Sequence, residues 1–339
     1  MQKEKIRYAP VLVTVYDRPE HFKQCIKSLL KNYSVSETTL FIFSDGPKDA
    51  KSFKRVTLVR EYIKSIHGFK RVIPFTPKEN TRGVGRLEVR DHLHDFSDRY
   101  IFSEDDNVFS PYFLNYMNSA LDIYEEDERI HAISGYMFPG FPASNLQPLL
   151  IKEFSAWGVG YWRDKFILPD FNHSKFAKQI FLDHNLFNKI NYGSPHLAPM
   201  LKQMAEGKLI AVDVIRSSLL YQHDCYCVFP SISMVRNIGN DGTGDHCGVN
   251  EIFSHQEICE AEMIFDRSTH LTFQASNQKW IRDYFGGRPA ILRNKLIFLE
   301  MNTSNLLLQW VLNFAFRFTN LTYRIVLRMM RNMKLKISI

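Results

Sequence analysis

The first hundred residues alternate between short apolar runs and longer segments with apolar residues at helical spacing. The apolar runs predict strands at 11–15, 40–43, 72–75 and 100–102. Between them, apolar residues recur every three or four positions, which predicts helices that follow Pro19, cross 53–63 and span 84–96. Strands that alternate with helices predict an α/β fold with a parallel sheet and right-handed crossovers.

The pattern is less regular after this point. Residues 111–123 predict an amphipathic helix, 130–134 a strand, and the Pro-, Gly- and aromatic-rich stretch 136–148 a loop. An aromatic and glycine cluster occupies 157–162, and 237–246 holds three glycines in ten residues. Such glycine density predicts a segment that is mobile or tightly turned.

Polar residues follow three of the predicted strands. Asp17 and Arg18 follow the first, Asp45 follows the second, and Glu104, Asp105 and Asp106 end the fourth. Open parallel sheets bind ligands at this edge. Three adjacent carboxylates repel one another and are costly to bury unpaired, and a divalent cation such as Mg²⁺ or Mn²⁺ relieves that cost. Such a cation could in turn hold a diphosphate, although an acidic surface turn is the simpler interpretation of these three residues alone.

The charge of +7 comes from the C-terminal end. Six of the 43 basic residues and no acidic residue lie after Glu300, which leaves 37 basic against 36 acidic residues in the rest. A nucleic-acid groove across the body is therefore not expected. The five cysteines lack CxxC spacing, which predicts neither a zinc site nor a disulfide framework and favours reduced thiols in the cytoplasm.

The C-terminal segment predicts a basic amphipathic helix. Arg317, Arg324, Arg328 and Arg331 fall on one helical stripe, with Trp310 and several phenylalanines in the same segment. The N-terminus has no signal-peptide pattern. The sequence contains no apolar run of 18 residues, so no membrane-spanning helix is predicted. Two interpretations stay open, a helix bound to an anionic membrane surface and a terminal helix packed on the body.

Taken together, these motifs resemble the inverting glycosyltransferases of the GT-A fold. The likeness is to the N-acetylglucosaminyltransferase I group and to bacterial capsule and lipopolysaccharide glycosyltransferases of family 2 type. It covers roughly residues 8–250 and rests on motifs that occur in the family's order. These motifs are 10–18, 41–46, the Asp-x-Asp variant 103–106, Trp157-Gly158, and 227–246.

The resemblance implies a mostly parallel sheet flanked by helices, followed by the helical tail. It divides the chain into a glycosyltransferase domain over 1–290 and the tail over 291–339. Residues 8–110 would bind the nucleotide and 111–290 the acceptor. The implied activity is transfer of a hexosyl or N-acetylhexosaminyl group from a nucleotide-sugar, expected to be a UDP-sugar, with Mn²⁺ or Mg²⁺. The acceptor would be a hydroxyl of a glycan or lipid-linked acceptor in surface polysaccharide synthesis, at the inner face of the cell membrane.

The resemblance also implies roles for the residues at the strand ends. Asp106 would contact the metal, and Glu104 and Asp105 would contact the ribose and donor sugar. Arg18 could donate to phosphate oxygens, or could form only a surface ion pair. Asp45 could face the uracil, or could only form the turn before Gly46-Pro47.

For the general base the matching residue is Asp213, with Asp224 as the second candidate. The family typically has Trp-Asp at this position, whereas Val212 and Val214 flank Asp213 here. These apolar neighbours predict burial, which would raise the pKa of the carboxyl group.

Three further residues have two interpretations each. Trp157 could stack on a sugar or belong to the core. His246 could contact metal or phosphate when the glycine-rich loop closes, or could be a free surface histidine. Arg86 or Arg82 could replace a histidine that the animal enzymes carry before the acidic motif.

Two other classes of function make different demands on the sequence. A nucleotidyltransferase has a similar sheet but needs a lysine-rich glycine loop directly after the first strand, where this chain has Asp17-Arg18-Pro19. A non-catalytic carbohydrate-binding protein would tolerate the loss of Asp106.

Overall fold

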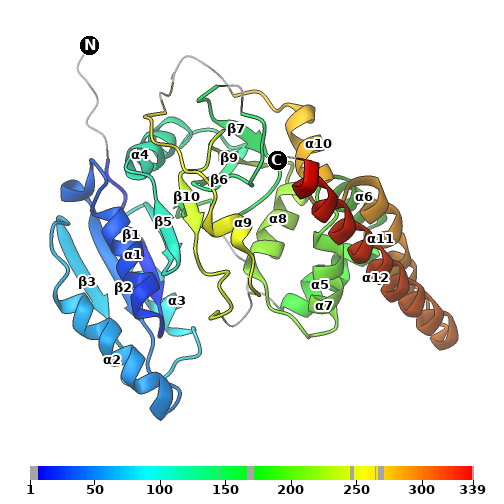
Figure 1. Cartoon of the computed structure of the whole chain (residues 1–339), viewed down its shortest axis with the longest axis horizontal. Helices are drawn as coiled ribbons and strands as arrows, with labels where there is room; N and C mark the ends of the chain where they lie inside the picture. The colour runs from blue at the N-terminus through cyan, green and yellow to red at the C-terminus, as the bar shows by residue number, and fades with distance from the viewer. Residues whose placement is uncertain are drawn as a thin grey trace. The chain divides into compact units, whose positions relative to one another are not determined.

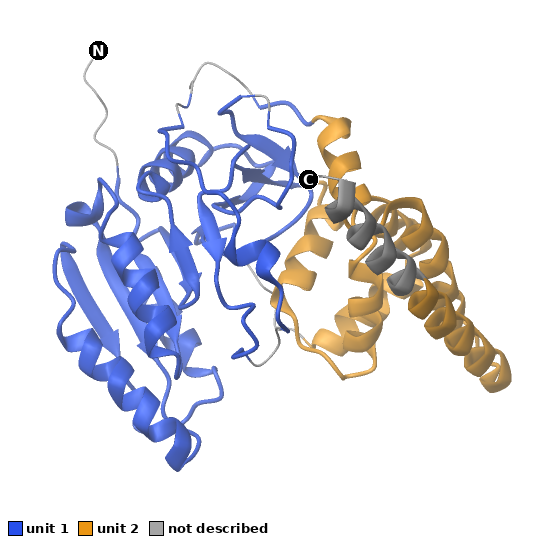
Figure 2. Ribbon diagram, in the orientation of Figure 1, with its two compact units in different colours: residues 1–167, 225–273 blue, residues 168–224, 274–339 orange. Residues whose placement is uncertain are grey.

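The computed structural model describes residues 7–143, 145–165, 172–244, 248–263, 265 and 271–337, with side chains up to residue 322. The chain forms two compact units (Figure 2). Unit 1 comprises 1–167 and 225–273, and unit 2 comprises 168–224 and 274–339. Each unit is therefore built from two separate stretches of the chain.

Unit 1 is an α/β unit built on an eight-stranded sheet with the order β3-β2-β1-β4-β8-β6-β9-β7 (Figure 1). The four strands β3, β2, β1 and β4 are mutually parallel, and β8 joins antiparallel to both β4 and β6. The pair β6 and β9 is parallel, β7 is antiparallel to β9, and β5 pairs with β10 in a separate ribbon. The strands are β1 Val11–Val15, β2 Thr39–Ser44, β3 Arg71–Phe75, β4 Arg99–Glu104, β5 Asn107–Phe109, β6 Ile130–Ser134, β7 Leu149–Ile151, β8 Val159–Trp162, β9 Tyr226–Phe229 and β10 Val235–Asn237.

Helices cover both faces of this sheet. They are α1 Pro19–Leu29, α2 Ala50–Lys64, α3 Gly85–Phe96, α4 Phe113–Ile123 and the short α9 Glu251–Ser254, with one 3₁₀ turn at Val35–Glu37. Alternate residues of β1, such as Val11 and Val13, share one core with apolar residues of α1, α2 and α4. On the opposite face, Phe41 of β2 packs against Phe96 of α3 with the ring centroids 5.4 Å apart. The buried strands read as nearly continuous apolar runs because both faces are covered.

The expected α/β class and the mostly parallel half of the sheet are confirmed. The four N-terminal strands and the strand at 130–134 lie where the hydrophobic runs predict them, within two residues at each end. The sequence pattern does not predict a strand in the aromatic and glycine cluster at 157–162, yet this cluster contains β8, which lies between β4 and β6. Glycine at position 160 leaves room for α4 to pack closely against β8, because a Cβ there would lie only 3.1 Å from the Met117 side chain of α4.

Unit 2 is helical and has its own core. Its helices are α5 His173–Leu182, α6 His184–Gly193, α7 Leu197–Ala205, α8 Val212–Gln222, α10 Ala275–Tyr284, α11 Gly287–Met301 and α12 Leu306–Ile337. Ile180, Phe187, Leu201 and Ile215 are buried in this core, and Phe316 of α12 packs against it. α12 therefore packs on unit 2 at Phe316, and binding of the tail to a membrane surface stays a prediction.

The boundary at 290 expected from the sequence differs from this division, because α11 and α12 belong with 168–224. A nucleotide-binding part over 8–110 and an acceptor part over 111–290 stay predictions. Among the described residues, no helix combines the length and apolar character needed to cross a bilayer.

Candidate functional site

The candidate site lies at the carboxyl edge of β1, β2 and β4. Because these strands are parallel, their ends meet at one edge, with Val15 beside Ser44 and Thr14 beside Glu104. Pro19 starts α1 directly after Arg18, as its fixed φ favours at a first helical turn. The chain therefore leaves the sheet at Arg18, opposite the acidic end of β4.

Arg18 pairs with two of the three acidic residues. Its Nη2 lies 2.6 Å from Oδ1 of Asp105 and 2.8 Å from Oδ2 of Asp106. Both aspartates are buried, and Arg18 is half-buried. Burial raises the pKa of Asp105 to about 6, and the attraction of Arg18 opposes that rise. With both aspartates ionised, one guanidinium leaves the cluster with a surplus negative charge.

This surplus charge is compatible with a divalent cation. Within the described residues no three His, Cys, Asp or Glu side chains converge as a complete protein-only metal site. Mg²⁺ in phosphate-handling sites is commonly held by one or two carboxylates together with substrate phosphates and water. The carboxylate oxygens of Asp105 and Asp106 are of the hard type that such a shared site uses, and metal contact by Asp106 stays a prediction. Glu104, half-buried at the end of β4, lies next to them in the chain.

Asn237 fixes the orientation of Asp106. In the antiparallel β5–β10 ribbon, Asn237 lies opposite Asn107. Its side-chain amide donates to Oδ1 of Asp106 at 2.8 Å and to Oδ1 of Asn107 at 3.1 Å, while its own Oδ1 accepts from the Gly239 amide at 3.0 Å. Sequence reasoning missed this residue, although it begins the glycine-rich segment that was singled out.

The glycine-rich segment approaches the acidic pair closely. A Cβ at Gly239 would lie 2.0 Å from Oδ2 of Asp106, so only glycine fits without displacement. Further along, the Asp241 carboxylate lies 3.1 Å from Nε2 of His21 on α1. The start of the segment is therefore tightly turned against the site. His246 lies outside the described residues.

Asp45 braces the loop that follows β3. Its buried carboxylate accepts from the backbone N–H groups of Gly46, Thr81 and Gly83 and from the Thr81 hydroxyl. The guanidinium of Arg60, also missed from the sequence, donates to the backbone oxygens of Ser44 at 3.0 Å and Asp45 at 3.2 Å. This geometry shows the turn-forming role of Asp45, and contact with a base stays a prediction.

Arg82 lies on the loop that Asp45 holds, and Arg86 lies in the first turn of α3. Both side chains are exposed, and Arg82 adopts a positive φ of 54°. The Arg82 backbone N–H donates to Oδ1 of Asn80 at 3.0 Å, which helps to hold this turn. Neither arginine is assigned to a ligand by its contacts, and their donor-binding roles stay predictions.

Trp157 is half-buried among other aromatic residues. Its ring makes edge contacts with Tyr136 at 4.7 Å and with Phe253 at 5.3 Å between centroids, and it packs against the unit 1 core. These contacts show the packing role that was one of its two interpretations. Stacking on a sugar stays a prediction.

Asp213 and Asp224 both belong to unit 2. Asp213 lies in the first turn of α8 and Asp224 follows the end of that helix, and both side chains are exposed. The expectation that Val212 and Val214 bury Asp213 is wrong, because a helical turn directs neighbouring side chains to different sides. Asp213 therefore lacks the apolar environment that its sequence neighbours predict.

Solved structures similar to this chain include TarS from S. aureus and a mannosyltransferase from Pyrobaculum calidifontis, each at 12% identity or less. TarS 1-349 from S. aureus is 12% identical with a TM-score of 0.40, covering 89% of this chain and 77% of that chain. The same protein in complex with UDP-GlcNAc is 10% identical with a TM-score of 0.43, covering 88% and 82%. The mannosyltransferase PcManGT from Pyrobaculum calidifontis, in complex with GDP-Man and Mn²⁺, is 11% identical with a TM-score of 0.40, covering 65% and 71%.

No protein-family model and no curated protein matches the sequence.

Proposed function

We propose that this chain is a metal-dependent inverting glycosyltransferase of the GT-A type. It transfers a hexosyl or N-acetylhexosaminyl group from a nucleotide-sugar, most simply a UDP-sugar, to a hydroxyl group of an acceptor. The observation that carries this proposal is the buried Asp105–Asp106 pair with Arg18, at the carboxyl edge of the parallel strands. A glycine-rich segment lies directly against it.

In this proposal, unit 1 binds the donor. Asp106 would hold Mn²⁺ or Mg²⁺, and the bound cation would supply Lewis-acid stabilisation of the negative charge that develops on the leaving diphosphate. Arg18 offers guanidinium donors to phosphate oxygens next to the start of α1. Glu104 and Asp105 would contact the ribose and donor sugar. Asp45 would face the base, and Arg86 and His246 would contact the phosphates.

The reaction needs a carboxylate that accepts a proton. Asp213, or alternatively Asp224, takes the proton of the acceptor hydroxyl as its oxygen attacks the anomeric carbon. A new C–O bond forms as the bond from the anomeric carbon to the diphosphate oxygen breaks, and the electron pair leaves with the diphosphate. Attack opposite the leaving group inverts the anomeric configuration.

The acceptor is proposed to be a glycan or a lipid-linked glycan of a surface polysaccharide. The acid-free segment after Glu300 supports a position at an anionic membrane surface, on its inner face, because its six basic residues attract anionic headgroups. The exposed Phe318 and Leu321 of α12 supply apolar side chains of the kind that enter a membrane interface.

A thermal-shift panel tests the donor-binding proposal. UDP-, GDP- and dTDP-sugars are compared with and without Mn²⁺, since a ligand at 100 times its Kd stabilises the folded state by about 2.7 kcal/mol. We expect a Mn²⁺-dependent rise in Tm with one nucleotide, absent in Asp106→Asn. The matched control is Asp95→Asn, which removes an exposed carboxylate of α3. Failure of every nucleotide to raise Tm, or an unchanged response in Asp106→Asn, contradicts the proposal.

A further inference from the structure

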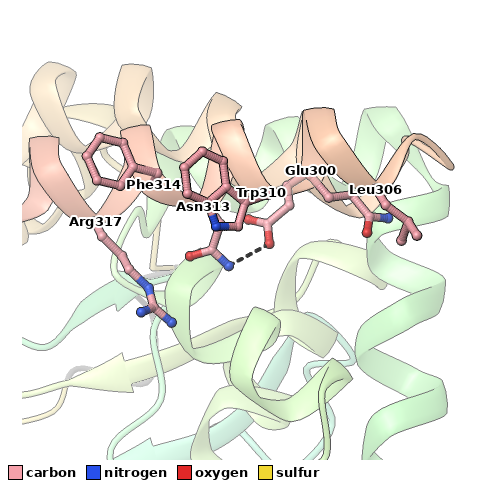
Figure 3. A pocket seen from close by; sticks show the side chains of 7 residues that line it. Glu300, Leu306, Trp310, Asn313, Phe314 and Arg317 are labelled. Atoms are coloured by element: carbon pink, nitrogen blue, oxygen red, sulfur yellow. Dashed lines mark hydrogen bonds between the residues drawn. The ribbon is translucent and has the colours of Figure 1, made fainter.

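Unit 2 contains a pocket that the proposed donor site does not use. It has a volume of about 390 Å³ and is formed by the last turn of α11 and the first turns of α12 (Figure 3). Polar and aromatic side chains both line it, as is usual in sites that orient a small ligand. The lining includes Glu300, Gln309, Trp310, Asn313, Phe314 and Arg317.

Glu300 brings a buried carboxylate to this pocket. Its side chain is 10% exposed, and its Oε1 accepts from the Asn313 amide at 2.9 Å and lies 3.2 Å from Nζ of Lys202. Its other oxygen, Oε2, is buried and has no hydrogen-bond partner among the described residues. A buried acceptor without a donor is costly and uncommon in native proteins. A ligand hydroxyl that donates to Oε2 would remove this cost.

The wall of the pocket contains two exposed aromatic rings. Trp310 is 66% and Phe314 is 60% exposed, and their rings stack with centroids 5.9 Å apart and an interplanar angle of 15°. They supply exposed aromatic surface beside the carboxylate. A pyranose ring has the complementary form, because its C–H groups make an apolar face and its hydroxyl groups lie around the edge.

The charges around the pocket favour a neutral ligand. A cation would meet Arg317 in the lining and Lys202 beside Glu300. An anion would meet the unpaired Oε2 of Glu300. A neutral polyhydroxylated ligand can donate to Oε2 and accept from the Arg317 guanidinium, with its apolar face on Trp310.

We propose that this pocket binds a neutral saccharide unit, as a glycan-binding subsite on unit 2. That the saccharide belongs to the acceptor rests on the proposed function, whereas binding of a saccharide does not. The volume accommodates one or two sugar rings, so the subsite would hold part of a longer glycan.

Saturation-transfer NMR on the full chain tests this. The probes are glucose, galactose, N-acetylglucosamine and their β-1,4-linked dimers. We expect signal transfer from at least one probe, and a Kd about tenfold or more weaker in Trp310→Ala, as for an aromatic anchor of a site. The matched control is Phe53→Ala, which removes a ring with 61% exposure on α2 of unit 1 that does not line the pocket. This control should retain saccharide binding.

Absence of binding by any probe, or equal binding in Trp310→Ala, overturns the subsite. Loss of anionic-vesicle binding in Trp310→Ala, with no saccharide binding by the native chain, assigns this face to the membrane and also overturns it. Binding of UDP with Mn²⁺, measured on the same samples, reports on unit 1 separately. A failure of nucleotide binding alone contradicts the proposed transferase and leaves saccharide binding standing.

Discussion

The side-chain amide of Asn237 donates a 2.8 Å hydrogen bond to Oδ1 of Asp106, across 131 residues of sequence. Arg18 holds the other carboxylate oxygen of Asp106 at 2.8 Å. The proposed metal ligand is therefore fixed from two sides by groups that also position the glycine-rich segment and α1. Such fixed orientation is what a site with one or two protein carboxylates requires.

Replacing Asn237 by aspartate should weaken metal-dependent nucleotide binding by about tenfold or more, as expected when a partner that orients a ligand is lost. The change removes the donor to Asp106 and places a like charge beside it. Titration of UDP in the presence of Mn²⁺ measures the effect. Asn188→Asp, an exposed change on α6, should bind UDP normally. Normal UDP binding by Asn237→Asp would remove the positioning role.

Gly239 and Gly248 give a matched pair of alanine substitutions in one loop region. A Cβ at Gly239 would lie 2.0 Å from Asp106 Oδ2, whereas a Cβ at Gly248 would meet nothing within 4 Å. Gly239→Ala should therefore displace the segment from the acidic pair and lose Mn²⁺-dependent nucleotide binding, while Gly248→Ala retains it. Isothermal titration of both variants checks this, and equal affinities would show that the close approach is not needed for binding.

The two base candidates can be separated by rate. Asp213→Asn should retain nucleotide and metal binding and lower turnover by about a hundredfold or more, the usual scale for loss of a general base. Asp224→Asn serves as the reciprocal variant, since it is also exposed and adjoins the same helix. Single-turnover transfer measures both. If only Asp224→Asn is inactive, the roles are exchanged, and if neither is inactive, both assignments are wrong.

The tail should bind anionic membranes through its charge. Replacing Arg324, Arg328 and Arg331 by glutamine should weaken binding to phosphatidylserine vesicles, each charge contributing on the order of 1 kcal/mol. Binding of the native chain should also fall with salt, because exposed charges are screened. Sedimentation with vesicles measures both effects.

The control variant removes the same number of positive charges from unit 1. In it, the exposed residues Lys31, Lys51 and Lys54 are replaced by glutamine. Equal losses in the two triple variants would show that overall charge, and not the tail, draws the chain to the vesicles.

The buried His196 should make the free energy of unfolding decrease as the pH is lowered. Burial lowers its pKa to about 3, and its ring stacks on Phe285 with centroids 3.6 Å apart. Below its ordinary pKa of about 6.5 the unfolded chain binds a proton that the folded chain does not, so stability falls as pH drops toward 3. The slope from this group is at most about 1.4 kcal/mol per pH unit.

Urea unfolding of the native chain and His196→Gln between pH 7 and 4 measures this slope. The variant should lose less stability on acidification than the native chain, whereas His67→Gln, an exposed change, should follow the native curve. Parallel curves for the native chain and His196→Gln would contradict the assignment.

The local pattern predicted β1, β2 and β4 and the polar groups that follow them. Strand length, apolar character and the proline that starts α1 are properties of adjacent residues, so they can be read from a single stretch of sequence. The meeting of Arg18 with Asp105 and Asp106 was also predictable in outline, because parallel strands bring their carboxyl ends to one edge.

The position of β8 depended on tertiary structure. Its four residues lack the apolar and polar alternation that predicts a strand. It pairs antiparallel between β4 and β6, and at Gly160 the absence of a side chain leaves room for Met117 of α4. The exposure of the Asp213 side chain also depends on the folded structure and not on its sequence neighbours alone. Apolar neighbours in sequence do not bury a side chain when a helix turns it to the opposite face.

By itself, the sequence determined which residues carry charge at the sheet edge and where the strands that hold them begin and end. Only the tertiary structure decided that Asn237 and Gly239 enclose Asp106, and that Glu300 of α11 and Trp310 of α12 line one pocket. The physical reason is that hydrogen bonds and close contacts between distant segments depend on how whole elements pack. Local propensity contains no information on that packing.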